Sequence, residues 1–203
     1  MISERIVGYL TVLPIFLVSL TVHEYAHGWV AYKCGDDTAK RLGRLTLNPL
    51  AHITLIGTII MPLIMRFGWA KPVPVNFAVL TKKDIFKVAA AGPATNILLA
   101  VTLAAAFHIF ALAAQPAIAN FVLLAILINL ILATFNLLPI PPLDGSKMVY
   151  ACLKSPAAIK AYMHYARFGM IIFIGFLVLG GFRLIFPVVA VVYNLLMLPG
   201  PAI

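Results

Sequence analysis

The stretch from Ile6 to Tyr32 reads IVGYLTVLPIFLVSLTVHEYAHGWVAY and sets the class of fold. At 27 residues it exceeds the roughly 20 that a helix needs to cross the hydrocarbon core of a membrane. Near its end, the apolar sequence is interrupted by two histidines and a glutamate. Ionisable groups at membrane depth cost about 2.5–3.5 kcal/mol each on insertion scales, so these three residues need a functional explanation.

His23, Glu24 and His27 form an HExxH motif. On a helix, residues four apart lie on the same face, so the two imidazoles can bind one metal ion while the glutamate lies beside it. This pattern is typical of a zinc site with a general base. The sequence therefore predicts a zinc ion bound inside a membrane.

Composition points to a polytopic membrane protein. The 203 residues are 63% hydrophobic and only 10% charged, with a mean hydropathy of +1.05. We expect one membrane-embedded domain over 1–203, in contact with lipid and without a soluble accessory domain. The net charge of +9 does not indicate nucleic acid, because the basic residues flank apolar segments.

The distribution of charge predicts the topology. Apolar stretches cover about 6–32, 53–67, 86–114, 117–138 and 168–198. Most Lys and Arg residues lie in the connectors 33–52, 68–85 and 139–167, which the positive-inside rule places in the cytosol. Segment 53–67 is too short to cross and has cytosolic flanks, so we expect it to be re-entrant.

The C-terminal part allows two topologies. Arg183 could reach the external surface, with the following residues returning across the membrane or lying flat. Pro187 predicts a kink or break in this region. The sequence is compatible with four or five crossings.

A catalytic zinc usually has three protein ligands, so the His pair requires a third. Asp144 follows the helix at 117–138 on the cytosolic side, where the HExxH motif also lies if 53–67 does not cross. The topology therefore favours Asp144 over the other candidates, which are His52, His108, His164, Cys34, Cys152, Asp36, Asp37 and Asp84.

The segment around Asp144 has features of its own. Prolines at 139, 141 and 142 should end the preceding helix and stiffen the chain. We expect Gly145 to allow a tight turn beside the carboxylate. Asn136 is a neutral amide within reach of the site and is suited to orienting a peptide carbonyl or an oxyanion.

These motifs resemble the site-2 protease family of intramembrane zinc metalloproteases. The resemblance rests on HEYAH at 23–27, Phe-Asn-x-x-Pro-x-x-x-x-Asp-Gly at 135–145 and Gly92-Pro93-Ala94-Thr95-Asn96. Trp69 to Val75 resembles the loop that this family folds beside its active site. Larger relatives carry PDZ-like or CBS-like domains, which this sequence lacks.

The resemblance implies one Zn²⁺ ligated by His23, His27 and Asp144, with Glu24 as the catalytic base. It also implies that Asn136 and Asn96 position substrate or stabilise the transition state. The implied fold is an all-α polytopic membrane protein. It has a three-helix catalytic core at about 6–150, a re-entrant or β-like loop on the cytosolic side, and C-terminal transmembrane helices at about 151–203.

The implied function is an intramembrane zinc endopeptidase of the cell membrane, with its active site toward the cytosol. It would hydrolyse peptide bonds in or near transmembrane segments of membrane protein substrates. Such a substrate must unwind locally, and we hypothesise that the edge from Pro72 to Val75 pairs with it. The alternative is a non-proteolytic metal-binding membrane protein, such as a transporter or an inactive homologue. The sequence does not indicate an oligomeric state.

Several residues also have purely structural interpretations. Asn96 could simply bond a neighbouring helix. The Gly92-Pro93 pair could be a packing kink. We expect His52 to be a structural residue at the interface, and Cys34 and Cys152 to be reduced and uninvolved.

Overall fold

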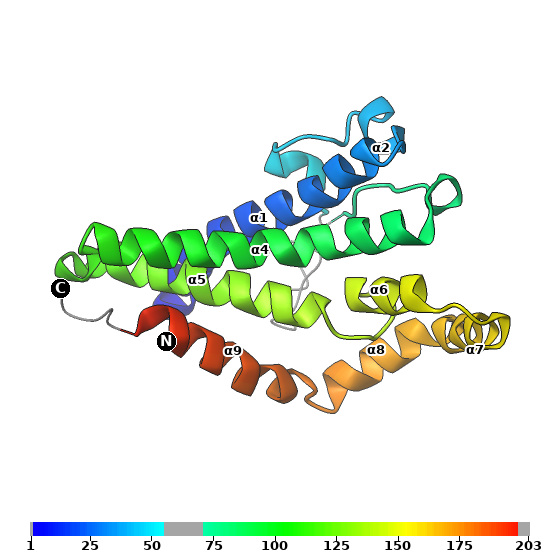
Figure 1. The fold of residues 1–203 in the computed structure, drawn as a ribbon. Coiled ribbons are helices and arrows are strands. Elements are labelled where there is room, and N and C mark those ends of the chain that lie inside the picture. Colours follow the sequence, from blue (N-terminus) through cyan, green and yellow to red (C-terminus); the bar gives the residue numbers. More distant parts are fainter. Residues whose placement is uncertain (1, 55–70, 199–203) are drawn as a thin grey trace.

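The computed structural model describes residues 2–54 and 71–198, and these residues contain helices and no β-strand. Figure 1 shows the order of the elements along the chain. The α-helices are α1 (Ile2–Lys33), α2 (Thr38–Arg41), α4 (Lys82–Ile109), α5 (Pro116–Asn136), α6 (Asp144–Cys152), α7 (Pro156–Arg167), α8 (Gly169–Val178) and α9 (Phe182–Met197). Three 3₁₀ turns join them: η1 (Pro49–His52), η3 (Phe77–Val79) and η4 (Leu112–Ala114).

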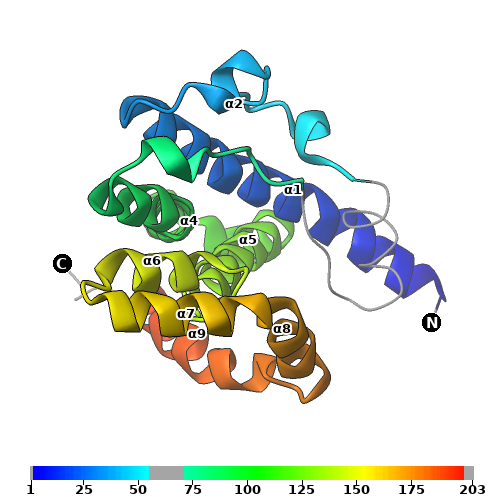
Figure 2. The ribbon, with the colours of Figure 1, turned by 90° about the vertical axis from the view of Figure 1, so that its right-hand side faces the viewer.

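Helices α1, α4 and α5 form the core of the molecule. Helices α1 and α5 run in the same direction and α4 runs against them (Figure 1). Alanines take part in this core, and Ala100 of α4 is fully buried in one cluster with Ile126 and Leu130 of α5. Small side chains allow helix backbones to approach one another closely, which is the usual way that helices pack in membranes. In Figure 2, α5 lies between the α1/α4 pair and the α6–α9 part of the chain.

Two of the described helices, α4 and α5, are long and apolar enough to cross a membrane. Helices α7 and α8 are long and apolar enough only when taken as a pair, and they are bent by 58° where they meet, while α9 is a shorter apolar helix. These helices agree with a polytopic membrane protein. The segment expected to be re-entrant, 53–67, lies largely outside the described residues.

Helix α4 begins directly after Thr81. The Thr81 hydroxyl accepts a hydrogen bond from the Asp84 N–H at 3.2 Å and donates one to the Asp84 carboxylate at 2.5 Å. The first of these bonds satisfies one of the unpaired N–H groups at the helix start. The spacing of Thr81 and Asp84 is that of a capping box, and Thr81 is the N-cap of this helix.

The chain between α5 and α6 brings Asp144 to the end of the core. Helix α5 ends at Asn136, ahead of the three prolines, as expected. Gly145, however, lies within the first turn of α6 and does not form a separate turn. A Cβ on Gly145 would lie 2.1 Å from the Leu137 carbonyl oxygen. Glycine is needed here because the start of α6 packs directly on the end of α5.

The C-terminal helices run past α5 one after the other. Gly169, at the start of α8, lies against Pro141, and at the end of α9 the Leu196 carbonyl oxygen lies 3.0 Å from His108 Nε2. The break between α8 and α9 is at Gly180, whose φ is +77°, and Pro187 lies inside α9. Of the kink or break that the sequence predicts at Pro187, the break is not seen there, because the helix continues through the proline. Gly181 N–H bonds the Phe176 carbonyl, which is the pattern that ends a helix at a left-handed glycine.

Candidate metal centre

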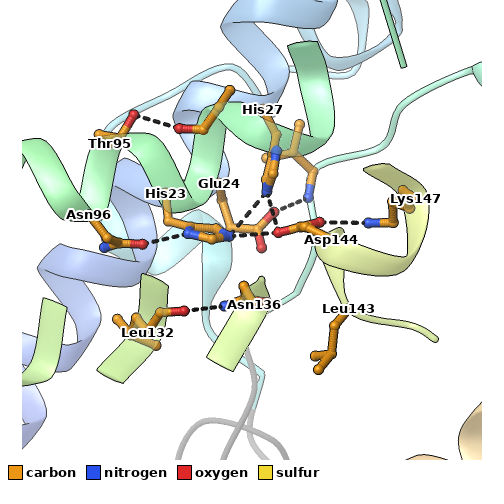
Figure 3. Close-up of polar contacts among 12 residues, drawn as sticks. His23, Glu24, His27, Thr95, Asn96, Leu132, Asn136, Leu143, Asp144 and Lys147 are labelled. Carbon is orange, nitrogen blue, oxygen red and sulfur yellow. Dashed lines mark hydrogen bonds and ion pairs between the residues drawn. The ribbon is translucent and has the colours of Figure 1, made fainter. Parts of the chain in front are cut away.

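The structure brings His23, His27 and Asp144 together in a buried cluster (Figure 3). The two Nε2 atoms are 3.0 Å apart, and Asp144 Oδ2 lies 3.2 Å from His23 Nε2 and 3.0 Å from His27 Nε2. The three residues are 2%, 8% and 4% exposed. Within residues 2–54 and 71–198, this is the one set of three such side chains arranged to hold a metal ion.

In both imidazoles, the Nδ1 atom faces a hydrogen-bond acceptor outside the cluster. His23 Nδ1 lies 2.6 Å from Asn96 Oδ1, and His27 Nδ1 lies 2.6 Å from the Val88 carbonyl oxygen. Each Nδ1 must therefore carry a hydrogen, which leaves a lone pair on each neutral Nε2. This arrangement orients both rings as metal ligands.

The donor set fits a zinc ion. Two imidazole nitrogens and one carboxylate oxygen, all with lone pairs, converge in a space where they would repel one another without a cation. Zinc at about 2.0–2.1 Å from tetrahedral ligands separates the ligand atoms by about 3.3 Å, close to the distances in this cluster. Three protein ligands leave a fourth position, as catalytic zinc sites do.

Lys147 holds the carboxylate of Asp144 in place. Its ammonium group donates to Asp144 Oδ1 at 2.9 Å, one turn along α6. The other oxygen, Oδ2, is the one that faces the histidines. Asp144 is therefore arranged to offer a single oxygen to a metal.

Glu24 lies beside the cluster and is held by a segment distant in sequence. Its Oε2 accepts a hydrogen bond of 2.8 Å from the Val73 backbone N–H. Val73 is 7% exposed, and its side chain occupies the space left by Gly28 of α1. The carboxylate is thus fixed next to the two imidazoles.

Further bonds fix the segment Lys71–Asn76 against the end of α1. The Asp36 carboxylate accepts from the Asn76 N–H at 2.7 Å, and the Arg44 side chain donates to the Lys71 carbonyl at 3.0 Å. The His52 carbonyl accepts from the Lys71 N–H at 2.9 Å. His52 is buried, and its ring bonds the Thr46 carbonyl, which agrees with the structural role expected for it.

The two asparagines to which the resemblance assigns a role make different contacts. Asn136 donates to the Leu132 carbonyl of its own helix at 2.9 Å, so its amide NH₂ is directed away from the ligand atoms. Asn96 is fully buried and contacts His23 directly. Their roles toward a substrate remain predictions.

Gly92 lets α4 approach the ligand atoms. A Cβ at this position would lie 2.4 Å from His27 Nε2 and 2.5 Å from His23 Nε2. Such distances are far inside van der Waals contact, so the imidazoles require glycine here. Gly92 therefore has a role at the metal centre besides the packing role that the sequence allows for the Gly92-Pro93 pair.

Sequence reasoning missed other residues that support the cluster. Ser19 and Asn129 are buried and bonded to Asn96, and Lys147 pairs with Asp144. Asn129 had a signal in the sequence, because it is an amide inside an otherwise apolar helix and such groups need partners. The Val88 carbonyl had no such signal, since every residue has one.

Comparison with known proteins agrees with this geometry. A model of peptidase family M50 matches residues 11–112 and 107–180. The chain is 43% identical over 168 residues to "Putative zinc metalloprotease YwhC" of Bacillus subtilis, covering 78% of this chain and 75% of that protein. It is 33% identical over 167 residues to the similarly named Rip3 of Mycobacterium tuberculosis, covering 81% of this chain and 37% of the relative.

No solved structure matches the chain. The family model covers most of the sequence and includes every residue of the cluster. Its relatives carry the name of zinc metalloproteases, and the donor set described above suits zinc. The chain therefore belongs to peptidase family M50, the site-2 protease family of zinc metalloproteases.

Proposed function

We propose that this zinc metalloprotease cleaves peptide bonds within or near the transmembrane segments of membrane proteins, toward the cytosolic side. One observation carries the proposal. The buried cluster of two histidines, an aspartate and a neighbouring glutamate lies among helices long and apolar enough to cross a membrane. A peptide bond that reaches this cluster must enter the same surroundings.

His23, His27 and Asp144 would hold the zinc, and Glu24 would act as the general base. Bound zinc would supply the acidity that makes water nucleophilic near neutral pH, and would polarise the substrate carbonyl. Glu24 accepts the Val73 N–H through one oxygen, and its carboxylate has a second oxygen with which to take a proton. It would then deliver that proton to the leaving amine.

The edge-pairing hypothesis for Pro72 to Val75 is limited by the backbone groups that this segment can offer. The N–H groups of Lys71 and Val73 are bonded to His52 and Glu24, and prolines have none to offer. A substrate could therefore pair with the Val75 N–H or with carbonyl groups of the segment. Val75→Pro removes that N–H without touching the Glu24 bond, and unchanged cleavage by that variant would rule out pairing through it.

The charges support a cytosolic active site. The basic connectors and the cluster lie at the same end of the core, whereas the uncharged turn at 110–115 lies at the other (Figure 1). Positive charge is retained on the cytosolic side of membranes. We infer that residues 1–203 act as one membrane domain.

The function is tested with purified protein, its zinc content and a panel of transmembrane substrates. We expect Glu24→Gln to retain zinc and to lose cleavage by a factor of at least about 100, since it removes the proton acceptor. We expect Asp144→Ala to lose zinc as well as cleavage. Equal cleavage by wild type and Glu24→Gln would refute the protease mechanism, and stoichiometric zinc in Asp144→Ala would refute the ligand set.

A further inference from the structure

Three buried polar side chains from three helices meet on the Nδ1 side of His23. They are Ser19 of α1, Asn96 of α4 and Asn129 of α5, which are 3%, 0% and 2% exposed. Buried polar groups are costly unless they are paired, and more so where lipid replaces water. In this cluster all four amide hydrogens of the two asparagines are paired.

The hydrogens of both amides are fully used. Asn129 Nδ2 donates to the Ala125 carbonyl and to Ser19 Oγ, each at 2.9 Å. Asn96 Nδ2 donates to Asn129 Oδ1 at 2.8 Å and to the Ser19 carbonyl at 3.2 Å. Asn96 therefore has no N–H left for a substrate carbonyl, which argues against the role in substrate positioning that the family resemblance implies for it.

The direction of the network is fixed by its backbone contacts. Carbonyl oxygens only accept hydrogen bonds, so the Ala125 carbonyl requires Nδ2 of Asn129 on its side and turns Oδ1 toward Asn96. Asn129 Oδ1 and the Ser19 carbonyl then require Nδ2 of Asn96, which turns Asn96 Oδ1 toward His23. His23 Nδ1, at 2.6 Å from that oxygen, must be the protonated nitrogen of the neutral ring.

We propose that Asn129 is a positioning residue for the metal centre. Together with the Ser19 carbonyl, it orients the Asn96 amide, and Asn96 in turn keeps His23 in the tautomer whose Nε2 is free to bind zinc. An amide that turned over would present N–H groups to His23 Nδ1 and would favour the opposite tautomer. This inference rests on the proposed zinc ligands, and it adds a third helix, α5, to the support of the first ligand.

The alternative is a purely structural role, in which Asn129 only hydrogen-bonds α5 to α1. A double-mutant cycle separates the two roles, because Asn96→Ala removes the amide altogether. With Ala at 96, nothing is left for Asn129 to orient. An effect of Asn129 on zinc that acts through the Asn96 amide should therefore vanish in the Asn96→Ala background.

The experiment measures zinc affinity by competition with a chelator in detergent, for Asn129→Leu, Asn96→Ala and the double variant. We expect Asn129→Leu to weaken zinc binding about 3–10-fold. This is less than the roughly 10–100-fold typical of a direct partner of a ligand. We expect Asn129→Leu to have no further effect once Asn96→Ala is present. Thr95→Val is the matched control, because the Thr95 hydroxyl bonds only its own helix, at Ala91.

Unchanged zinc affinity in Asn129→Leu, or the same loss in both backgrounds, would overturn the proposal. If Asn129→Leu does not fold, Asn129→Ala removes the same amide at smaller volume and is judged by the same criteria. Failure of the wild type to bind zinc would instead refute the zinc site itself. The two failures are therefore distinguishable.

Discussion

Gly92 determines how closely α4 can pass the two imidazoles. The backbone of α4 runs beside His23 Nε2 and His27 Nε2, and a methyl group at 92 would occupy the place of these ligand atoms. Alanine favours helix over glycine by about 1 kcal/mol, so the helix itself would tolerate the change. The cost of Gly92→Ala should therefore appear at the metal centre and not in the helix.

We predict that purified Gly92→Ala contains well under one zinc per chain and cleaves poorly. The imidazoles would have to turn away from Asp144 to avoid the new methyl group. Metal analysis after dialysis against a weak chelator measures the first effect. Gly175→Ala is the control, because a Cβ there meets no atom within 4 Å and zinc should stay stoichiometric. Full zinc in Gly92→Ala would contradict the close approach.

At the scale of single residues, the sequence was enough to identify the candidate metal ligands and base, but not the orientation of the side chains around them. HExxH and Asp144 were identifiable because ionisable groups in apolar surroundings are expensive. The rotamers of Asn96 and Asn136 were not, because they depend on distances among three helices. Asn96 contacts His23, whereas Asn136 bonds back to Leu132. The family resemblance implies both asparagines, but the two side chains make different contacts.

At the scale of elements, the segment Lys71–Asn76 depends on Asp36. Burial alone would raise the pKa of this carboxyl, but hydrogen bonds from Thr38 and Asn76 outweigh it and hold the pKa below its ordinary 3.8. A depressed pKa in the folded protein means that the ionised form stabilises the fold. This contribution is complete above about pH 4 and is lost as the pH falls through the folded pKa.

We predict that Asp36→Asn loosens the segment without removing zinc. One of its two acceptor oxygens becomes an NH₂ group that faces a backbone N–H, of either Thr38 or Asn76. Hydrogen exchange at Val73 and Asn76 should quicken, and KM should rise more than kcat falls. The difference in Tm from wild type should shrink as the pH falls below about 4. Asp37→Asn, at the exposed neighbour that pairs with Arg41, should change none of these.

Helix limits were predictable where a local rule applied. Thr81 caps α4 and the prolines follow the end of α5, as their sequences indicate. The kink or break expected at Pro187 is not where α8 and α9 separate, because Pro187 lies inside α9, which begins five residues earlier at Phe182. A proline this close to a helix start removes few hydrogen bonds. The break follows the left-handed Gly180 instead.

At the scale of the whole molecule, contacts at both ends of α8–α9 favour four crossings over five. The chain leaves the cluster end at Gly169 and reaches the opposite end at Leu196, beside His108. Phe182 and Ile185, on either side of Arg183, pack against Phe135 near the cluster end of α5. Arg183 therefore lies partway along the bundle, and the expected position at the external surface does not fit these contacts.

With the proposed cytosolic active site, four crossings would place Cys152 in the cytosol and the turn at Gln115 outside the cell. Cys152 is exposed at the end of α6 and is the better native reporter. Burial, together with the Asp84 carboxylate, raises the pKa of the Cys34 thiol and slows its reaction on either side. Cys34→Ser removes this second thiol and leaves Cys152 as the single cysteine.

In intact cells, we predict that a membrane-impermeant maleimide leaves Cys152 unlabelled and labels Gln115→Cys made in a cysteine-free background. Disrupting the membrane should make Cys152 react, because its side chain is exposed in the folded protein. Since α5 alone separates residue 115 from the segment that carries Asp144, the two labels report opposite ends of one crossing. External labelling of Cys152 in intact cells would put the metal centre on the outer side and reverse the proposed orientation.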